Sequence, residues 1–91
     1  MLTREEQIAV GGVWAIPGVD RYWIRPLDGA RINVRTGRAS LPYRPAKRLG
    51  SPIHSLGGTS RTVASLVRAA LEDPAAQPAA YFPPAREGGE G

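Results

Sequence analysis

Three polar side chains, Arg31, Asn33 and Arg35, are of the types that read bases in DNA. They alternate with Ile32 and Val34, and successive side chains of a β-strand point to opposite faces, so a strand here would project all three from one face. In the major groove, Arg pairs with O6 and N7 of guanine, and Asn pairs with N6 and N7 of adenine. The spacing fits a β-ribbon in the major groove, and it fits an ordinary solvated strand face equally well.

Positive charge is concentrated in the middle of the chain. Residues 21–68 contain ten Lys and Arg side chains and one carboxylate, Asp28, whereas residues 1–20 and 71–91 carry more acidic than basic side chains. Such a basic segment attracts polyanions, of which nucleic acid is the commonest, although the charge could also serve solubility alone. We expect phosphate contacts from five further cations of this segment: Arg25, Arg38, Arg44, Lys47 and Arg48.

Aromatic side chains could stack on bases or pack in the core. Because a small domain needs its large aromatic side chains inside, we expect Trp14 and Tyr22 in the core. Trp23 has the opposite strand parity to Tyr22 and is the better candidate for an exposed ring. We expect the adjacent pair Tyr81 and Phe82 to dock onto the sheet or, alternatively, to engage a partner.

Few side chains of the chain are suited to catalysis or metal binding. There is no Cys, the single His is His54, and the carboxylates gather near the two ends. Zinc sites need several Cys or His ligands, and phosphodiester hydrolysis needs a metal ion or a general base near a water molecule. We therefore predict no catalytic residue, no metal, no cofactor and no enzymatic activity, with a structural role for His54.

Turn residues separate short β-like runs in the first half of the chain. The pairs Pro17-Gly18, Asp28-Gly29 and Thr36-Gly37 punctuate segments rich in β-branched and aromatic residues, which indicates an antiparallel meander. The expected strands cover residues 13–16, 21–25 and 30–35, with weaker candidates at 41–43 and 52–56. The basic loop between the last two contains Arg44, Lys47 and Arg48.

Two helices are expected. Thr3 and Glu6 have the spacing of a capping box in front of a short helix over residues 4–10. Residues 60–72 form the stronger candidate, with Thr59 or Ser60 as N-cap and apolar side chains on one face, so this helix should pack across the sheet. Those apolar side chains are Val63, Leu66, Val67, Ala70 and Leu71.

The predicted architecture is one small α+β domain, because 91 residues can bury a single core. It has a three- to five-stranded antiparallel sheet packed by one amphipathic helix. We divide the chain into a short N-terminal helix and linker (1–12), a basic α+β domain (13–73) and a flexible tail rich in Ala, Pro and Gly (74–91). No apolar run approaches the ~20 residues that a bilayer span needs, so we expect a cytoplasmic protein with no membrane partner.

The order of several short motifs resembles the NUMOD type of DNA-binding module, which occurs beside HNH nuclease domains in phage homing endonucleases. That family begins with W-x-I-x-G, continues with a Y-x-I strand and a G-x-V turn and strand, and ends with a helix similar to T-V-H-R-L-V-A-x-A-F. The corresponding residues here are Trp14-Ala15-Ile16-Pro17-Gly18, Tyr22-Trp23-Ile24, Asp28-Gly29 with Ile32 and Val34, and Thr62-Val63 leading to Leu66-Val67 and Ala70-Leu71.

The departures from that pattern concern the nuclease part. Ala64 stands where the family helix has His, and Leu71 stands where it has Phe. After Pro74 the chain continues as an Ala- and Pro-rich segment, where the family supplies the HNH residues. The resemblance therefore implies a phage-encoded DNA-binding module without cleavage activity.

These observations predict a non-catalytic module that contacts duplex DNA through a basic sheet face. The alternative is a small protein-interaction factor that binds or inhibits a host or phage protein, through Tyr81 and Phe82 or the sheet face. The two differ in their response to salt, since phosphate contacts lose affinity steeply as salt rises and an apolar interface does not.

Overall fold

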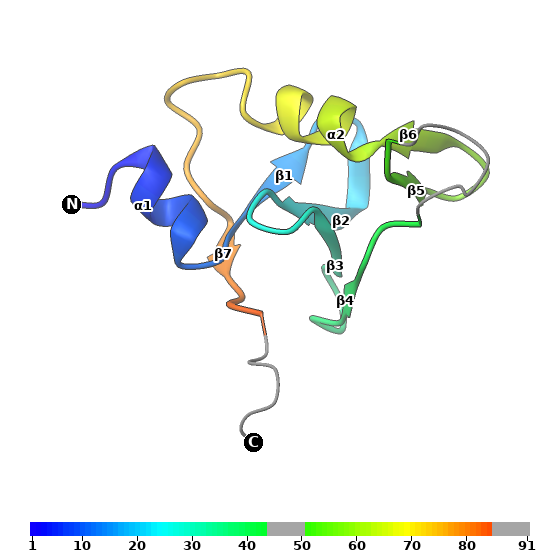
Figure 1. Cartoon of the computed structure of the whole chain (residues 1–91), viewed down its shortest axis with the longest axis horizontal. Coiled ribbons are helices and arrows are strands. Elements are labelled where there is room, and N and C mark those ends of the chain that lie inside the picture. The colour runs from blue at the N-terminus through cyan, green and yellow to red at the C-terminus, as the bar shows by residue number, and fades with distance from the viewer. Residues whose placement is uncertain (44–50, 85–91) are drawn as a thin grey trace.

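The computed structural model describes residues 1–43 and 51–84, which form an α+β fold (Figure 1). Five antiparallel strands form the larger sheet in the order β4-β3-β2-β1-β7, and β5 pairs with β6 in a second, two-stranded sheet. The elements are α1 (Arg4–Ala9), β1 (Gly12–Ile16), β2 (Val19–Arg25), β3 (Ala30–Asn33), β4 (Ala39–Ser40), β5 (Ile53–Ser55), β6 (Ser60–Thr62), α2 (Val63–Ala70) and β7 (Ala80–Tyr81).

The antiparallel meander β1-β2-β3-β4 confirms the predicted architecture. Its turns lie at the predicted glycines, and Gly18 and Gly29 both adopt positive φ angles, of 80° and 76°, that other residues rarely tolerate. The strand expected at 41–43 is replaced by β4, which is earlier in the chain, and Tyr43 forms only an isolated bridge with Ile53.

Both helices begin with a threonine cap. Thr3 forms the expected capping box: its Oγ1 accepts from the Glu6 amide at 3.1 Å, and its own amide donates to Glu6 Oε1 at 2.8 Å. The second helix begins later than predicted, at Val63, because residues 60–62 pair with β5 as strand β6. Thr62 is therefore the N-cap in place of Thr59 or Ser60, and its Oγ1 accepts from the Ser65 amide at 3.1 Å.

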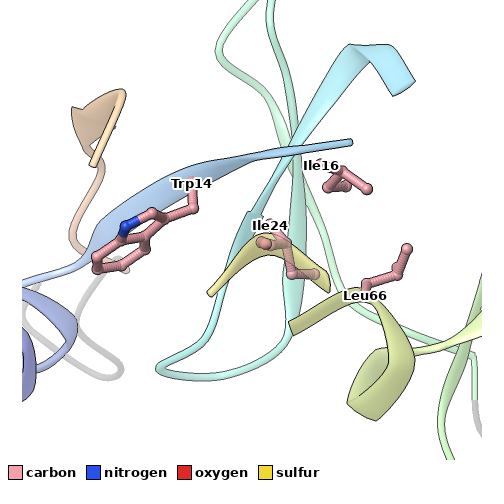
Figure 2. Close-up of a cluster of buried hydrophobic side chains, with 5 residues drawn as sticks. Trp14, Ile16, Ile24 and Leu66 are labelled. Carbon is pink, nitrogen blue, oxygen red and sulfur yellow. The ribbon is translucent and has the colours of Figure 1, made fainter. Parts of the chain in front are cut away.

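The main core lies between the sheet and α2. Figure 2 shows Leu66 of α2 beside Ile16 and Ile24 of the sheet, and these side chains are buried together with Trp14. The predicted core position is confirmed for Trp14, whereas Tyr22 is half-buried and packs against the same cluster.

A second buried cluster occupies the other face of the sheet. Val13, Ala30 and Ile32 are fully buried there, and Phe82 packs against them. Trp23 is half-buried in this cluster, because the Phe82 ring covers it at a centroid distance of 5.9 Å. The prediction that Trp23 presents an exposed ring is therefore wrong.

Part of the expected flexible tail is the fifth strand of the sheet. β7 pairs with the beginning of β1, matching Tyr81 with Gly12 and Ala80 with Val13, and Figure 1 shows it in orange beside β1. The predicted docking of the aromatic pair onto the sheet is thus confirmed. The Arg4 guanidinium holds the approach to β7 by donating to the carbonyls of Asp73, Pro74 and Ala76.

Candidate functional site

Three exposed arginines come from the beginning of β2 and from the turn between β3 and β4. The Val34 amide donates to the Arg21 carbonyl at 2.9 Å, which sets Arg21 beside the turn that follows β3. That turn is closed by bonds from the Gly37 amide to Asn33 O at 2.7 Å and from the Asn33 amide to Arg38 O at 2.9 Å. Arg21, Arg35 and Arg38 are all exposed, and we call them the basic rim.

The arginines of the basic rim form no ion pair among the described residues, although Asp20 precedes Arg21 in the chain. Within residues 1–43 and 51–84, the one ion pair joins Arg25 to Asp28, so no rim arginine has a carboxylate partner there. Exposed guanidinium groups without such partners are well suited to charge-assisted hydrogen bonds with phosphate oxygens.

Two shallow grooves border the rim. The first has a volume of about 260 Å³ and is lined by Asp20, Arg21, Tyr22, Asn33, Val34 and Arg35. The second, of about 390 Å³, is lined by Gly18, Val19, Asp20, Arg21, Tyr22, Leu56 and Gly57. They share the start of β2, so Arg21 lies at the boundary of both.

Arg31 is directed onto the protein itself. In the register of the sheet, Arg31 lies opposite Ile24, so it projects from the face that carries the main core. Its guanidinium lies 4.3 Å from the centroid of the Tyr22 ring, and Nη1 donates to the Ser55 carbonyl. A guanidinium held this way is not positioned for bidentate contact with guanine.

Asn33 is engaged in the turn after β3. Its Oδ1 accepts from the amides of Arg35 at 2.9 Å and Thr36 at 3.1 Å. Bidentate recognition of adenine needs that oxygen as the acceptor for N6. Since Arg35 lies in the turn beyond the end of β3, the predicted base-reading row of Arg31, Asn33 and Arg35 is not formed.

Arg25 is buried, contrary to its predicted place on phosphates. Only 4% of the residue is exposed. Its Nε and Nη2 donate to the Asp28 carboxylate at 2.9 and 2.8 Å, and Nη1 donates to the Phe82 carbonyl at 2.6 Å. Burial acts to raise the pKa of Asp28, but the hydrogen bonds from Arg25 and the Ala30 amide outweigh it and lower that pKa.

The remaining predicted phosphate contacts divide into two groups. Arg38 is exposed on the rim. Arg44, Lys47 and Arg48 lie outside the described residues. The sequence reasoning missed Arg21 as a site residue, although pairing the two runs around Asp28-Gly29 as a hairpin places it opposite Val34.

His54 is buried and contacts the turn between β2 and β3. Its Nε2 lies 2.7 Å from the Gly29 carbonyl oxygen. Burial lowers the pKa of His54 and the nearby charge of Arg31 adds to this, against the opposing effect of the bond to Gly29. Across the part of the chain that the structure describes, no three His, Cys, Asp or Glu side chains are grouped as metal ligands.

No helix among the described residues is both long enough and apolar enough to cross a bilayer.

No protein-family model, curated protein sequence or solved structure matches the chain. The resemblance to the NUMOD modules therefore depends on the order of the short motifs alone.

Proposed function

We propose that the protein binds duplex DNA without catalysing a reaction on it, and that it does so through the phosphates. The observation that supports this proposal is the basic rim: Arg21, Arg35 and Arg38 are all exposed and have no carboxylate partner in residues 1–43 and 51–84, and Arg21 and Arg35 line one groove. The resemblance of the chain's short motifs to the NUMOD DNA-binding modules also supports this proposal.

Phosphate contact is favoured over base reading. Arg31 and Asn33, the two residues best suited to read bases from β3, make hydrogen bonds within the protein. The rim arginines come from the beginning of a strand and from a turn. From there they can contact the DNA phosphate backbone without a sheet face entering the major groove. Phosphate contacts set orientation and affinity, and they carry little sequence information.

Salt dependence provides the first test. Each neutralised phosphate contributes a slope of about −0.9 to log K against log salt, so contacts from three rim arginines predict a slope near or steeper than about −2.7. Fluorescence anisotropy of a labelled duplex at several salt concentrations measures this slope. A slope close to zero contradicts phosphate binding.

Charge reversal then locates the interface. We expect Arg35→Glu to weaken binding at low salt by roughly tenfold, and Arg21→Glu/Arg35→Glu to weaken it further and to flatten the slope by about two. Arg68→Glu is the matched control, because Arg68 is also exposed and the substitution makes the same charge change on α2. Equal losses in Arg35→Glu and Arg68→Glu would mean that net charge alone governs binding.

A further inference from the structure

We propose that the edge of β1 and the adjoining face of the sheet form a peptide-binding site, which the protein's own residues 79–83 occupy. The partner that fits it is an extended segment of another protein with a small residue, a variable residue, an aromatic residue and proline in succession. Such a partner binds by replacing β7 as the fifth strand of the sheet. This site is separate from the basic rim and does not depend on DNA binding.

The backbone contacts of this site accept many sequences. The Ala79 amide donates to the Val13 carbonyl at 2.7 Å, and the Phe82 amide donates to the Gly11 carbonyl at 2.8 Å. Strand addition of this kind supplies affinity through main-chain groups that every non-proline residue has. If β7 left, β1 would become the edge strand and present unpaired backbone groups.

Side-chain contacts supply the selectivity. Ala80 packs on the buried cluster of Val13, Ala30 and Ile32, where a small side chain fits. The Phe82 ring lies against Trp23, and a methyl group placed on Gly37 would lie 3.4 Å from its Cε2, so the ring spans the face as far as the β3–β4 turn. Tyr81 is 45% exposed and imposes no comparable demand.

Two receptor residues are shaped for a backbone that crosses at this point. Arg25 is buried, and it directs Nη1 to the Phe82 carbonyl, which any residue at that position provides. A Cβ on Gly11 would lie 2.6 Å from the Pro83 Cα, so the absence of a side chain at Gly11 lets the segment pass.

β7 is suited to exchange with a strand from a partner. It contains two residues at the edge of the sheet, whereas α2 and the main core pack on β1 and β2 from the other face. Short elements with few buried apolar contacts open more readily than the core of a domain. Residues 79–83 of the chain occupy the site at an effective concentration of about millimolar. Weakening their contacts should therefore allow a separate peptide to bind.

The experiment uses a fluorescent synthetic peptide with the sequence of residues 76–84, added to the full chain. We expect the Phe82→Ala chain to bind it at least tenfold more tightly than the wild-type chain does, because the variant's own tail competes poorly. A peptide with Ala in place of Phe82 should lose most of this affinity, and one with Ala in place of Tyr81 should retain it. Amide shifts at Gly11, Gly12 and Val13 should mark the binding edge.

A second variant separates displacement from unfolding. Ala79→Pro removes the amide that donates to Val13 and leaves the Phe82 ring intact, so it should also gain peptide binding. Folded variants that show no peptide binding at millimolar concentration would overturn the proposal. Loss of the folded state in both variants, seen by circular dichroism, would overturn it as well, because β7 would then be a fixed part of the fold.

Discussion

Arg25 and Arg35 show how differently two arginines of one small sheet are used. Arg25 is buried at the end of β2, where its guanidinium binds a carboxylate and the carbonyl of a residue 57 positions away. Arg35 is exposed in the turn after β3 and has no carboxylate partner in the described parts of the chain. Arg25 therefore stabilises the fold, and Arg35 is available to a ligand.

Other arginines among the described residues are likewise either bonded within the fold or exposed without a carboxylate partner there. Arg4 resembles Arg25, since it donates to the backbone carbonyls of Asp73, Pro74 and Ala76 and lies 5.6 Å from the Trp14 ring centroid. Arg21 and Arg38 resemble Arg35. A count of positive charges therefore overestimates the surface available to a polyanion.

The largest expected effect comes from removing the buried guanidinium. Arg25→Ala should lower the free energy of unfolding by about 2–3 kcal/mol, because it leaves the Asp28 carboxylate and the Phe82 carbonyl without their donor. Urea unfolding followed by tryptophan fluorescence measures the change. A loss below about 0.5 kcal/mol would place Arg25 with the surface arginines.

A pair of glycines tests how closely the tail is packed. Gly11 and Gly18 both have positive φ, but an added Cβ meets the Pro83 backbone at Gly11 and nothing within 4 Å at Gly18. Gly18→Ala should cost about 1 kcal/mol from backbone strain, and Gly11→Ala about 1 kcal/mol more. Equal losses in thermal unfolding would show that Pro83 moves away without cost.

Two titratable side chains, His54 and Asp28, should lower the stability of the fold in acid over different pH ranges. His54 has a folded-state pKa below its ordinary 6.5, so the unfolded chain binds more protons, and stability falls as the pH drops below 6.5 toward the folded value. Asp28 also has a lowered pKa, so its contribution holds above 3.8 and is lost as the pH falls further. Urea midpoints between pH 7 and pH 3 measure both losses. His54→Gln should remove the first loss, and a profile unchanged by that substitution would contradict this assignment.

The smallest expected effect on stability is at the rim. Arg35→Ala should change the free energy of unfolding by less than about 0.5 kcal/mol, since its exposed side chain supports no part of the fold. The same variant should bind DNA more weakly in the anisotropy assay. A stability loss as large as that of Arg25→Ala would erase the distinction between the two arginines.

Local patterns were enough to predict the elements whose stability is local. The Thr3 and Glu6 side chains meet within one helical turn, and the glycine-containing turns join strands that pair with their immediate neighbours in the chain. The apolar face around Leu66 likewise follows from helical spacing and is buried as expected. In each case the contacts that matter lie a few residues apart or follow a simple period.

Tertiary contacts decided the fifth strand, the start of α2 and the uses of the arginines. β7 exists because residues 80–81 meet the beginning of β1, almost seventy positions earlier in the chain, and α2 starts at Val63 because residues 60–62 pair with β5. Arg25 is structural because Phe82 returns to cover the second face of the sheet. An arginine has the same charge in either setting, so burial and hydrogen-bond partners assign its role, and for Arg25 the burial and one of the partners, the Phe82 carbonyl, come from a distant part of the chain.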